Sequence, residues 1–240
     1  MKPAIRYVAD VDQVREVSLR GAADLAFWKE RLRPEGLTPA ERDGRAQLLI
    51  VAATMKFMGI RFSEVSFSVL VAGTELEGWE SGAFLVQAFN TSRLFAWCER
   101  VLFATPYLHA HARVSVLSPV SIRLTKGGKS VFHAELQADP TRPERLALRS
   151  DNEAWEGPVF LPRIRRGGGG RYFVARMKGQ STAYSFLREV DALSIIPSLD
   201  TEILRTLLES EFTAEEWLVR ENARHGKSKT YPQSKFGGPA

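Results

Sequence analysis

Ionisable and hydroxyl side chains recur at every second residue in three short stretches of the sequence. Side chains two residues apart on a β-strand point to the same face, so each stretch predicts a strand with one polar face. The three polar faces carry Glu64, Ser66 and Ser68, then His109, His111 and Arg113, and finally His133 and Glu135. One such face is usually the solvent side of a sheet. Three of them in a chain with few helices predict a cavity lined by ionisable groups, which is the usual setting of a ligand site.

Proton transfer is the chemistry that these residue types suit best. Histidine titrates near neutral pH, so Glu64 with His109 or His111 is the expected set of acid and base groups. Tyr107 precedes the histidines and could polarise a carbonyl group by donating a hydrogen bond. Two arginines, Arg100 and Arg113, are the expected partners of an anionic ligand. The predicted ligand is therefore a small, oxygenated anion.

The pair His109-x-His111 also raises the question of a metal ion. A catalytic zinc ion needs three protein ligands and a second shell, so two imidazoles are too few unless Glu64, His133 or Glu135 joins them. The sequence has no G-x-S-x-G motif, phosphate-binding loop or paired C-x-x-C, and its run of four glycines does not lead from a strand into a helix. We therefore expect no metal and no cofactor.

Apolar runs and period-two alternation define the expected elements. Strands are predicted at residues 46–53, 62–71, 83–89, 109–116, 120–124, 131–136, 171–177 and 192–196. Helices are predicted at 21–32, before Pro106, at 199–208, and from a capping-box pattern that begins at Thr213. The run 46–53 is apolar throughout, which indicates a strand buried on both faces.

The helix before Pro106 is expected to begin at a cap formed by Asn90, Thr91 or Ser92. Its apolar residues follow helical spacing and predict a stripe packed on the core. The members of this stripe are Leu94, Trp97, Cys98, Val101 and Leu102.

Short strands joined mostly by turns, with three or four helices, predict an α+β fold built on a closed antiparallel β barrel with a few peripheral helices. Residues 1–224 are expected to form a single domain. The polar, basic, Gly- and Pro-punctuated residues 225–240 are expected to form a flexible tail.

Composition narrows the setting of the protein. The 240 residues are 44% hydrophobic and 25% charged, in the range of ordinary globular proteins. The single cysteine excludes an intrachain disulfide, and no signal peptide or membrane-spanning run is visible, so we expect a cytoplasmic protein with no membrane partner. A net charge of +5 is too small to argue for nucleic acid.

Arg100 lies six residues before Pro106, and Phe62-Ser63-Glu64 precedes it in the chain. These features resemble the acetoacetate decarboxylase superfamily, in which the segment reads approximately R-E-x-x-x-x-P-K-K. The similarity extends loosely from Ser18 to Arg176. It implies a closed antiparallel β barrel with a ligand cavity inside.

The resemblance also implies what is missing. Decarboxylases of the superfamily form a Schiff base on the first lysine after the proline, activated by the second lysine. Here those positions are Tyr107 and Leu108, which cannot form an imine. The family's first cavity glutamate falls near Leu49, whereas its second matches Glu64. The resemblance is thus to a branch that lacks the lysine pair, and the family's usual decarboxylation is not expected.

Three functions remain open from the sequence. The first is small-molecule binding or lyase-type activity inside the barrel without Schiff-base chemistry, which would make the protein an enzyme or a binding protein. The second is a non-enzymatic structural or interaction module on the same fold. The third is nucleic-acid binding through the basic loop around residues 163–171 and the tail, and it ranks last. Assembly into a homo-oligomer is also left open.

Overall fold

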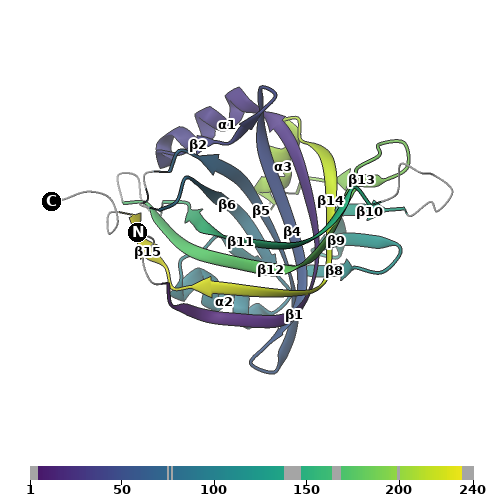
Figure 1. The fold of residues 1–240 in the computed structure, drawn as a ribbon, viewed down its shortest axis with the longest axis horizontal. Coiled ribbons are helices and arrows are strands. Elements are labelled where there is room, and N and C mark those ends of the chain that lie inside the picture. The colour runs from purple at the N-terminus through teal and green to yellow at the C-terminus, as the bar shows by residue number, and fades with distance from the viewer. Residues whose placement is uncertain are drawn as a thin grey trace.

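A computed structural model of the chain describes residues 5–74, 76, 78–137, 147–163, 169–198 and 201–233. The described strands form one 11-stranded and one 4-stranded sheet. The elements in chain order are β1 (Tyr7–Asp24), α1 (Leu25–Leu32), a 3-10 turn (Arg33–Glu35), β2 (Thr38–Pro39), β3 (Glu41–Arg42), β4 (Arg45–Phe57), β5 (Ile60–Ala72), β6 (Ser81–Asn90), α2 (Arg93–Leu102), β7 (Tyr107–His109), β8 (His111–Ser115), β9 (Val120–Lys126), β10 (Lys129–Leu136), β11 (Arg149–Leu161), β12 (Arg171–Ser185), β13 (Ala192–Ile195), α3 (Glu202–Glu209), β14 (Thr213–Ser228) and β15 (Tyr231–Pro232) (Figure 1).

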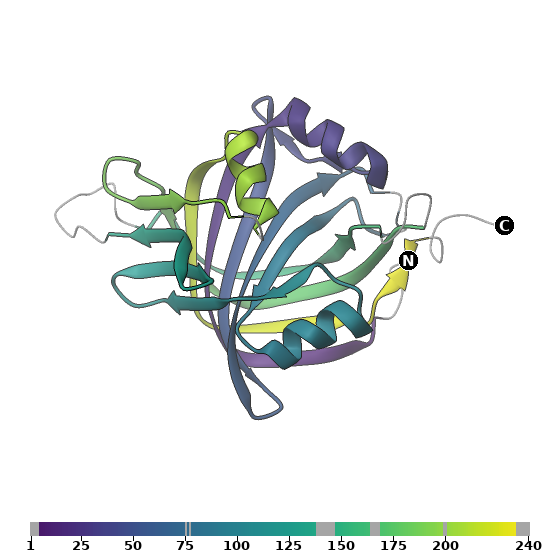
Figure 2. The ribbon, with the colours of Figure 1, turned by 180° about the vertical axis from the view of Figure 1, so that it is seen from behind.

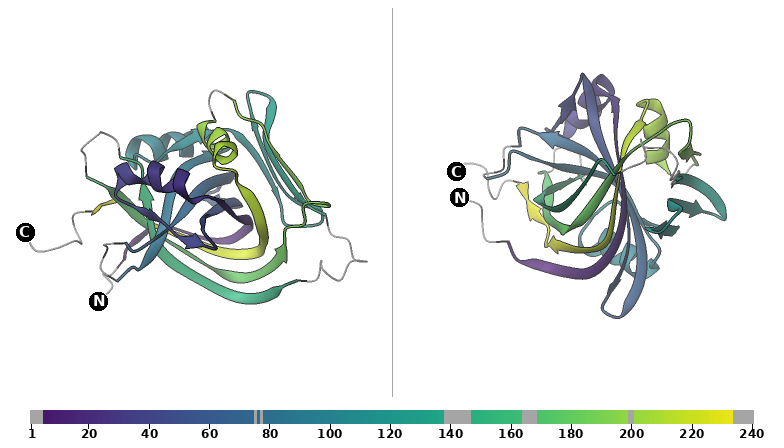
Figure 3. Two further views of the ribbon diagram at one scale, coloured as in Figure 1. Left: turned by 90° about the horizontal axis from the view of Figure 1, so that it is seen from above. Right: turned by 45° about the vertical axis from the view of Figure 1, so that its right-hand side comes forward.

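Seven strands of the large sheet pair in a cycle. Their order is β5, β4, β1, β14, β12, β11 and β6, and β6 pairs again with β5. Each of these strands therefore has two hydrogen-bonded neighbours within the cycle, and Figure 3 shows how strongly the sheet curves. The pairing is antiparallel except where β6 meets β11 and β7, which corrects the expectation of a wholly antiparallel sheet.

The small sheet and the helices α1 and α3 pack on one face of the large sheet. Val65 and Phe67 of β5 are buried there, and the ring of Phe67 lies 5.6 Å from that of Phe132 on β10. Trp28 of α1 and Leu204 of α3 belong to the same apolar core. Figure 2 shows the helices in front of the large sheet. The alternation in residues 62–71 thus correctly predicted which face of this strand is apolar.

The other face of β4 and β5 is more accessible. Leu48 and Ile50 are buried, whereas Leu49 and Val51 are only half-buried, as is Ser66 on β5. The prediction that β4 is buried on both faces is therefore wrong. The partly accessible face is the one that carries Glu64.

The N-terminal segment is a long strand, although helical spacing predicted a helix from residue 21. Gly21 still belongs to β1, and the helix begins only at Leu25, after Asp24 accepts a hydrogen bond from the backbone N–H of Phe27 at 2.5 Å. A side chain at Gly21 would lie 2.3 Å from the carbonyl oxygen of Thr213. The glycine therefore allows β14 to approach, and sheet pairing overrides local helix propensity.

The segment 213–228 is the strand β14, not the predicted helix and tail. It pairs with β1 on one side and β12 on the other, and Trp217 and Val219 point into the apolar core. The predicted flexible tail is wrong for residues 225–228, which end this strand, and for Tyr231–Pro232, which form β15 against β12. Residues 234–240 lie outside the described part of the chain, as do 164–168 of the basic loop.

The helix α2 is capped by Ser92, which accepts a hydrogen bond from Phe95 N at 3.3 Å, but its predicted buried stripe is wrong. The side that packs on the sheet carries Ala96, which is buried, and Phe95, whose ring lies 4.8 Å from that of Phe62. The apolar stripe faces outward instead, with exposed fractions of 54% for Leu94, 49% for Trp97, 52% for Val101 and 65% for Leu102.

The predicted strand 109–116 is divided between the two sheets. β7 pairs with β6 in the large sheet, whereas β8 pairs with β9 in the small one, and Ala110 lies between them. The hairpin expected at Lys126–Lys129 is correct, and its two glycines have positive φ. Within the described residues, no helix is long and apolar enough to cross a bilayer.

Candidate functional site

Six polar side chains from four strands and a helix lie together against the curved sheet. We call them the polar cluster: Glu16 of β1, Glu64 of β5, Glu99 of α2, Tyr107 of β7, and His225 and Lys227 of β14. The charges of Lys227 and His225 both act on the carboxyl group of Glu64. Because β4 and β1 separate β5 from β14 in the sheet, these groups meet only through the curvature of the sheet.

Lys227 supplies a positive charge to the cluster. Its Nζ donates a short hydrogen bond to Glu99, and Thr105 Oγ1 donates to the same carboxylate at 2.9 Å. The ammonium group also lies 4.6 Å from the ring centroid of Phe173 and 5.6 Å from that of Tyr107. An ion pair and aromatic faces are contacts that suit an ammonium ion.

Glu64 and Tyr107 form the centre of the cluster. The phenol of Tyr107 lies beside the carboxyl group of Glu64, to which it can donate, and Asn90 Nδ2 lies 3.4 Å from Glu64 Oε2. Burial and the charge of Glu99 raise the pKa of Glu64, against the opposing effects of Lys227 and Tyr107. Burial and the two carboxylates hold the pKa of Tyr107 well above its usual value, so the phenol stays protonated and can donate. A carboxyl group with a raised pKa is suited to proton transfer.

Replacing Glu64 with Gln is expected to stabilise the protein at pH 7 by on the order of 1 kcal/mol. The raised pKa means that the folded state disfavours the charged form, and Gln removes that charge while its carbonyl still accepts from Tyr107. Denaturant unfolding measures the change. The control is Glu99→Gln, which should destabilise because it breaks the ion pair with Lys227. A loss of stability in Glu64→Gln would contradict the prediction.

A second group of charges adjoins the first through His225. His225 Nε2 lies 2.6 Å from Glu16 Oε2, and Arg220 and Ser18 donate to Glu16 Oε1. Arg220 also donates to Glu153 of β11. The side chains of Glu16 and Arg220 are each only 1% exposed. Burial alone would raise the pKa of Glu16, but His225, Arg220 and Ser18 outweigh it and lower that pKa to about 2.

The structure brings together only some of the residues predicted from sequence. Glu64 and Tyr107 are neighbours in the polar cluster, as described above. His109 is half-buried beside Arg93 and Lys126, and burial together with these charges lowers its pKa. Its ring lies 5.5 Å from that of His111, which is exposed.

Neither predicted ligand-binding arginine points into the polar cluster. Arg100 is exposed on α2, and Arg113 is exposed on β8 in the small sheet. The physical reason for the displacement of His111 and Arg113 is that the chain leaves the large sheet at Ala110. No group of three metal-ligating side chains exists among the described residues.

Sequence reasoning missed the part of the cluster that β1 and β14 carry. Glu16 precedes the first predicted helix, and His225 and Lys227 lie in the predicted tail 225–240. A usable signal was present in β1, where Val17 and Leu19 are buried in the core and alternate with Glu16 and Ser18. Alternation over this stretch is typical of a strand with one polar face.

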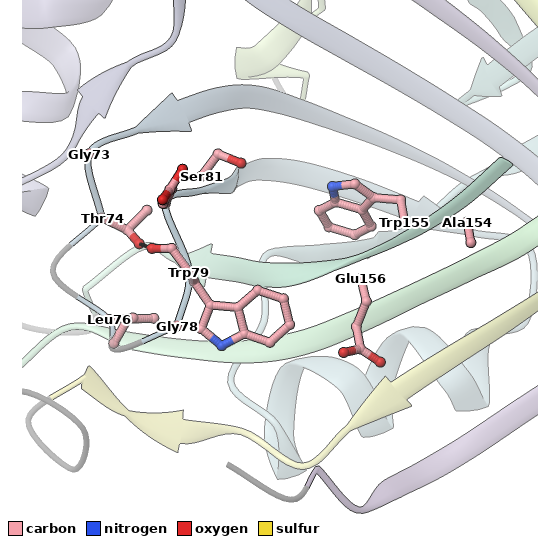
Figure 4. A pocket seen from close by; sticks show the side chains of 10 residues that line it. Gly73, Thr74, Leu76, Gly78, Trp79, Ser81, Ala154, Trp155 and Glu156 are labelled. Carbon is pink, nitrogen blue, oxygen red and sulfur yellow. Dashed lines mark hydrogen bonds between the residues drawn. The ribbon is translucent and has the colours of Figure 1, made fainter. Parts of the chain in front are cut away.

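A cavity of 1070 Å³ opens at the edge of the curved sheet, where the loop between β5 and β6 passes β11. Its lining includes Trp79, Trp155 and Glu156 (Figure 4). β6 and β11 pair only at Ala83–Phe84 with Val159–Phe160, so the two strands diverge before this point.

Solved structures share this arrangement of strands. An acetoacetate decarboxylase structure superposes with a TM-score of 0.62 at 14% identity, covering 96% of this chain and 90% of that one. The chain has the acetoacetate decarboxylase-like fold. The enduracididine biosynthesis enzyme MppR complexed with pyruvate gives a TM-score of 0.62 at 13% identity, covering 99% and 93% of the two chains. Acetoacetate decarboxylase from Legionella pneumophila gives 0.58 at 13% identity, covering 96% and 92%.

These superpositions confirm the resemblance to acetoacetate decarboxylases that the sequence suggested. At these identities the likeness establishes the fold alone. No protein-family model matches the sequence, and no curated protein is significantly similar to it. Within this acetoacetate decarboxylase-like fold, Tyr107 and Leu108 follow Pro106, and the amine near Tyr107 comes from Lys227 on another strand.

Proposed function

We propose that the cycle of seven strands is a closed barrel, and that the polar cluster binds a small oxo acid in its interior for a proton-transfer or lyase-type reaction. The observation that carries the proposal is the meeting of an ammonium group, a neutral phenol and a carboxyl group of raised pKa. The half-buried side chains on the cluster's face of β4 and β5 support access from solvent. A protein of the same fold, MppR, has been solved with pyruvate bound.

Each group has a distinct role in this proposal. Lys227 attracts the ligand's carboxylate, Tyr107 polarises its carbonyl oxygen, and Glu64 gives or takes the proton next to that carbonyl. His225 connects the cluster to the buried carboxylate of Glu16. These roles replace His109, His111, Arg100 and Arg113 as the proposed ligand-handling residues.

The proposed chemistry does not use a Schiff base, even though a lysine lies in the cluster. An imine forms only on an unprotonated amine, and the Glu99 carboxylate and the aromatic faces around Lys227 are partners of the protonated form. Borohydride reduction in the presence of pyruvate should therefore add no mass to Lys227. Detection of a reduced pyruvate adduct on Lys227 would contradict this prediction and would show that the ligand binds through an imine.

Pyruvate binding tests the assignment, with calorimetric titration as the measurement. Lys227→Met is expected to weaken binding roughly tenfold to a hundredfold, because a charge-assisted hydrogen bond is lost. Lys229→Met is the matched control, since Lys229 contacts the ring of Tyr231 instead of the cluster and its loss should leave affinity unchanged. Equal affinities of Lys227→Met and the unaltered protein would overturn the assignment.

A further inference from the structure

We propose that a second site, separate from the polar cluster, binds the phosphate group of a small metabolite, or free phosphate, between Arg113 and Arg123 on the small sheet. A cavity of 580 Å³ opens there against the end of the β4–β5 hairpin. Both arginines line it. The site goes beyond the proposed function, which involves neither residue.

The strand register places two positive charges directly opposite each other. Arg113 of β8 pairs with Arg123 of β9, and Arg123 in turn pairs with His133 of β10. Directly opposed side chains have Cβ atoms about 5 Å apart, and like charges at that separation destabilise a sheet. Among the described residues, neither guanidinium has a hydrogen-bond or ion-pair partner. An anion held between them would neutralise the repulsion.

The rest of the cavity lining suits an oxyanion. Ser115 and Ser121 are opposite each other in the next row of the same two strands. Thr54 and Ser63 add a pair of hydroxyl groups, whose oxygens are 2.8 Å apart, from the large sheet. Hydroxyl groups can donate to phosphate oxygens, and arginine forks match phosphate geometry in two-point hydrogen bonds.

One carboxylate, that of Glu135, also lines the cavity. Its Oε2 lies 3.7 Å from Nε2 of His133 on the same strand. Two arginines against one carboxylate leave a positive charge in the cavity. That balance favours an anion of high charge density such as phosphate.

The test is thermal unfolding at constant ionic strength, with inorganic phosphate or glycerol phosphate replacing chloride. The unaltered protein should unfold at a higher temperature in phosphate, because a ligand that binds the folded state raises the midpoint. Arg113→Gln and Arg123→Gln should each raise the dissociation constant for phosphate at least tenfold. A larger shift with glycerol phosphate than with free phosphate would identify a metabolite as the natural source, and equal shifts would identify free phosphate.

Lys129→Gln is the matched control for general charge effects. It removes one charge from another like-charged pair of the small sheet, Lys126 and Lys129, which lies outside the cavity. This variant should keep the full phosphate shift. The proposal is overturned if the unaltered protein unfolds at the same temperature in phosphate as in chloride. It is also overturned if both arginine variants keep the full increase in unfolding temperature, or if Lys129→Gln loses as much of the increase as the arginine variants do.

Discussion

Lowering the pH from 4.5 to about 2 is expected to remove about 3 kcal/mol of unfolding free energy through one carboxylate, Glu16. The pKa of Glu16 is about 2 in the folded protein, against 4.5 without its partners. The folded state therefore binds this proton less readily than the unfolded chain. The stabilisation is fully present above pH 4.5 and is lost as the pH falls toward 2.

Glu64 acts in the opposite sense, because its pKa is raised in the folded protein. Protonating it relieves a cost, so it favours folding as the pH falls through its folded-state pKa, above the range in which Glu16 titrates. The combined effect is a stability maximum in mildly acidic solution. Denaturant unfolding from pH 2 to 7 measures how the free energy of unfolding falls on each side of this maximum.

The variant Glu16→Gln tests whether Glu16 causes the loss of stability below pH 4.5. It should be less stable than the unaltered protein at pH 7, because it leaves Arg220 and His225 without a buried carboxylate, and its stability should change less between pH 4.5 and 2. Asp10→Asn is the comparison on the same strand, since Asp10 is exposed and its arginine pairs are screened by solvent. If the unfolding free energy of Glu16→Gln fell as steeply between pH 4.5 and 2 as that of the unaltered protein, the loss would come from other carboxylates.

Arg220→Leu is expected to lower the free energy of unfolding by roughly 3–5 kcal/mol. The guanidinium is buried and donates to both Glu16 and Glu153, so its removal leaves a buried carboxylate partly uncompensated. Chemical denaturation at pH 7 measures the loss. Among the charged residues of β14, this one should have the largest effect on stability.

Arg224→Leu is the matched control for this substitution. Arg224 lies on the same strand and pairs with Asp10, but its side chain is 51% exposed, so the loss of unfolding free energy should be much smaller than for Arg220→Leu. The double variant Glu16→Met with Arg220→Leu should recover part of the stability, because it removes both buried charges. Similar losses in Arg220→Leu and Arg224→Leu would show that burial does not determine the strength of this pair.

Much of the middle of the chain is predictable from the sequence. Period-two alternation locates β5 and identifies its polar face, so the sequence alone places Glu64 on the face that carries the polar cluster. Tyr107 is identified by its position after Pro106 and lies in the polar cluster. Both predictions depend on information that is local in sequence.

The strands β1 and β14 were misread because their local signals favour helix. The Thr213 capping-box pattern and the spacing around Leu25 both suit a helix, yet each segment is extended by its pairing partners. Pairing between residues so distant in sequence leaves little trace in local propensity. Lys227 was missed for a second reason, because the polar, Gly- and Pro-punctuated composition of residues 225–240 predicted a tail.

Two other errors have different causes. Ala110 fits the alternation of the predicted strand 109–116, so nothing local marks the change from one sheet to the other. In α2, helical spacing correctly located an apolar face around Trp97 but could not say whether it faces the protein or the solvent. Amphipathic patterns give the direction of a face only relative to the helix.

The pairing of β1 with β14 also determines when the site can exist during synthesis on the ribosome. Glu16 and His225, which meet across these strands, are separated by 209 residues. A nascent chain that has not yet extended past β14 lacks both Lys227 and the neighbour that β1 requires on that side. Assembly of the site therefore waits until β14 has been synthesised, and the emerging β1 must keep an unpaired edge until this partner arrives.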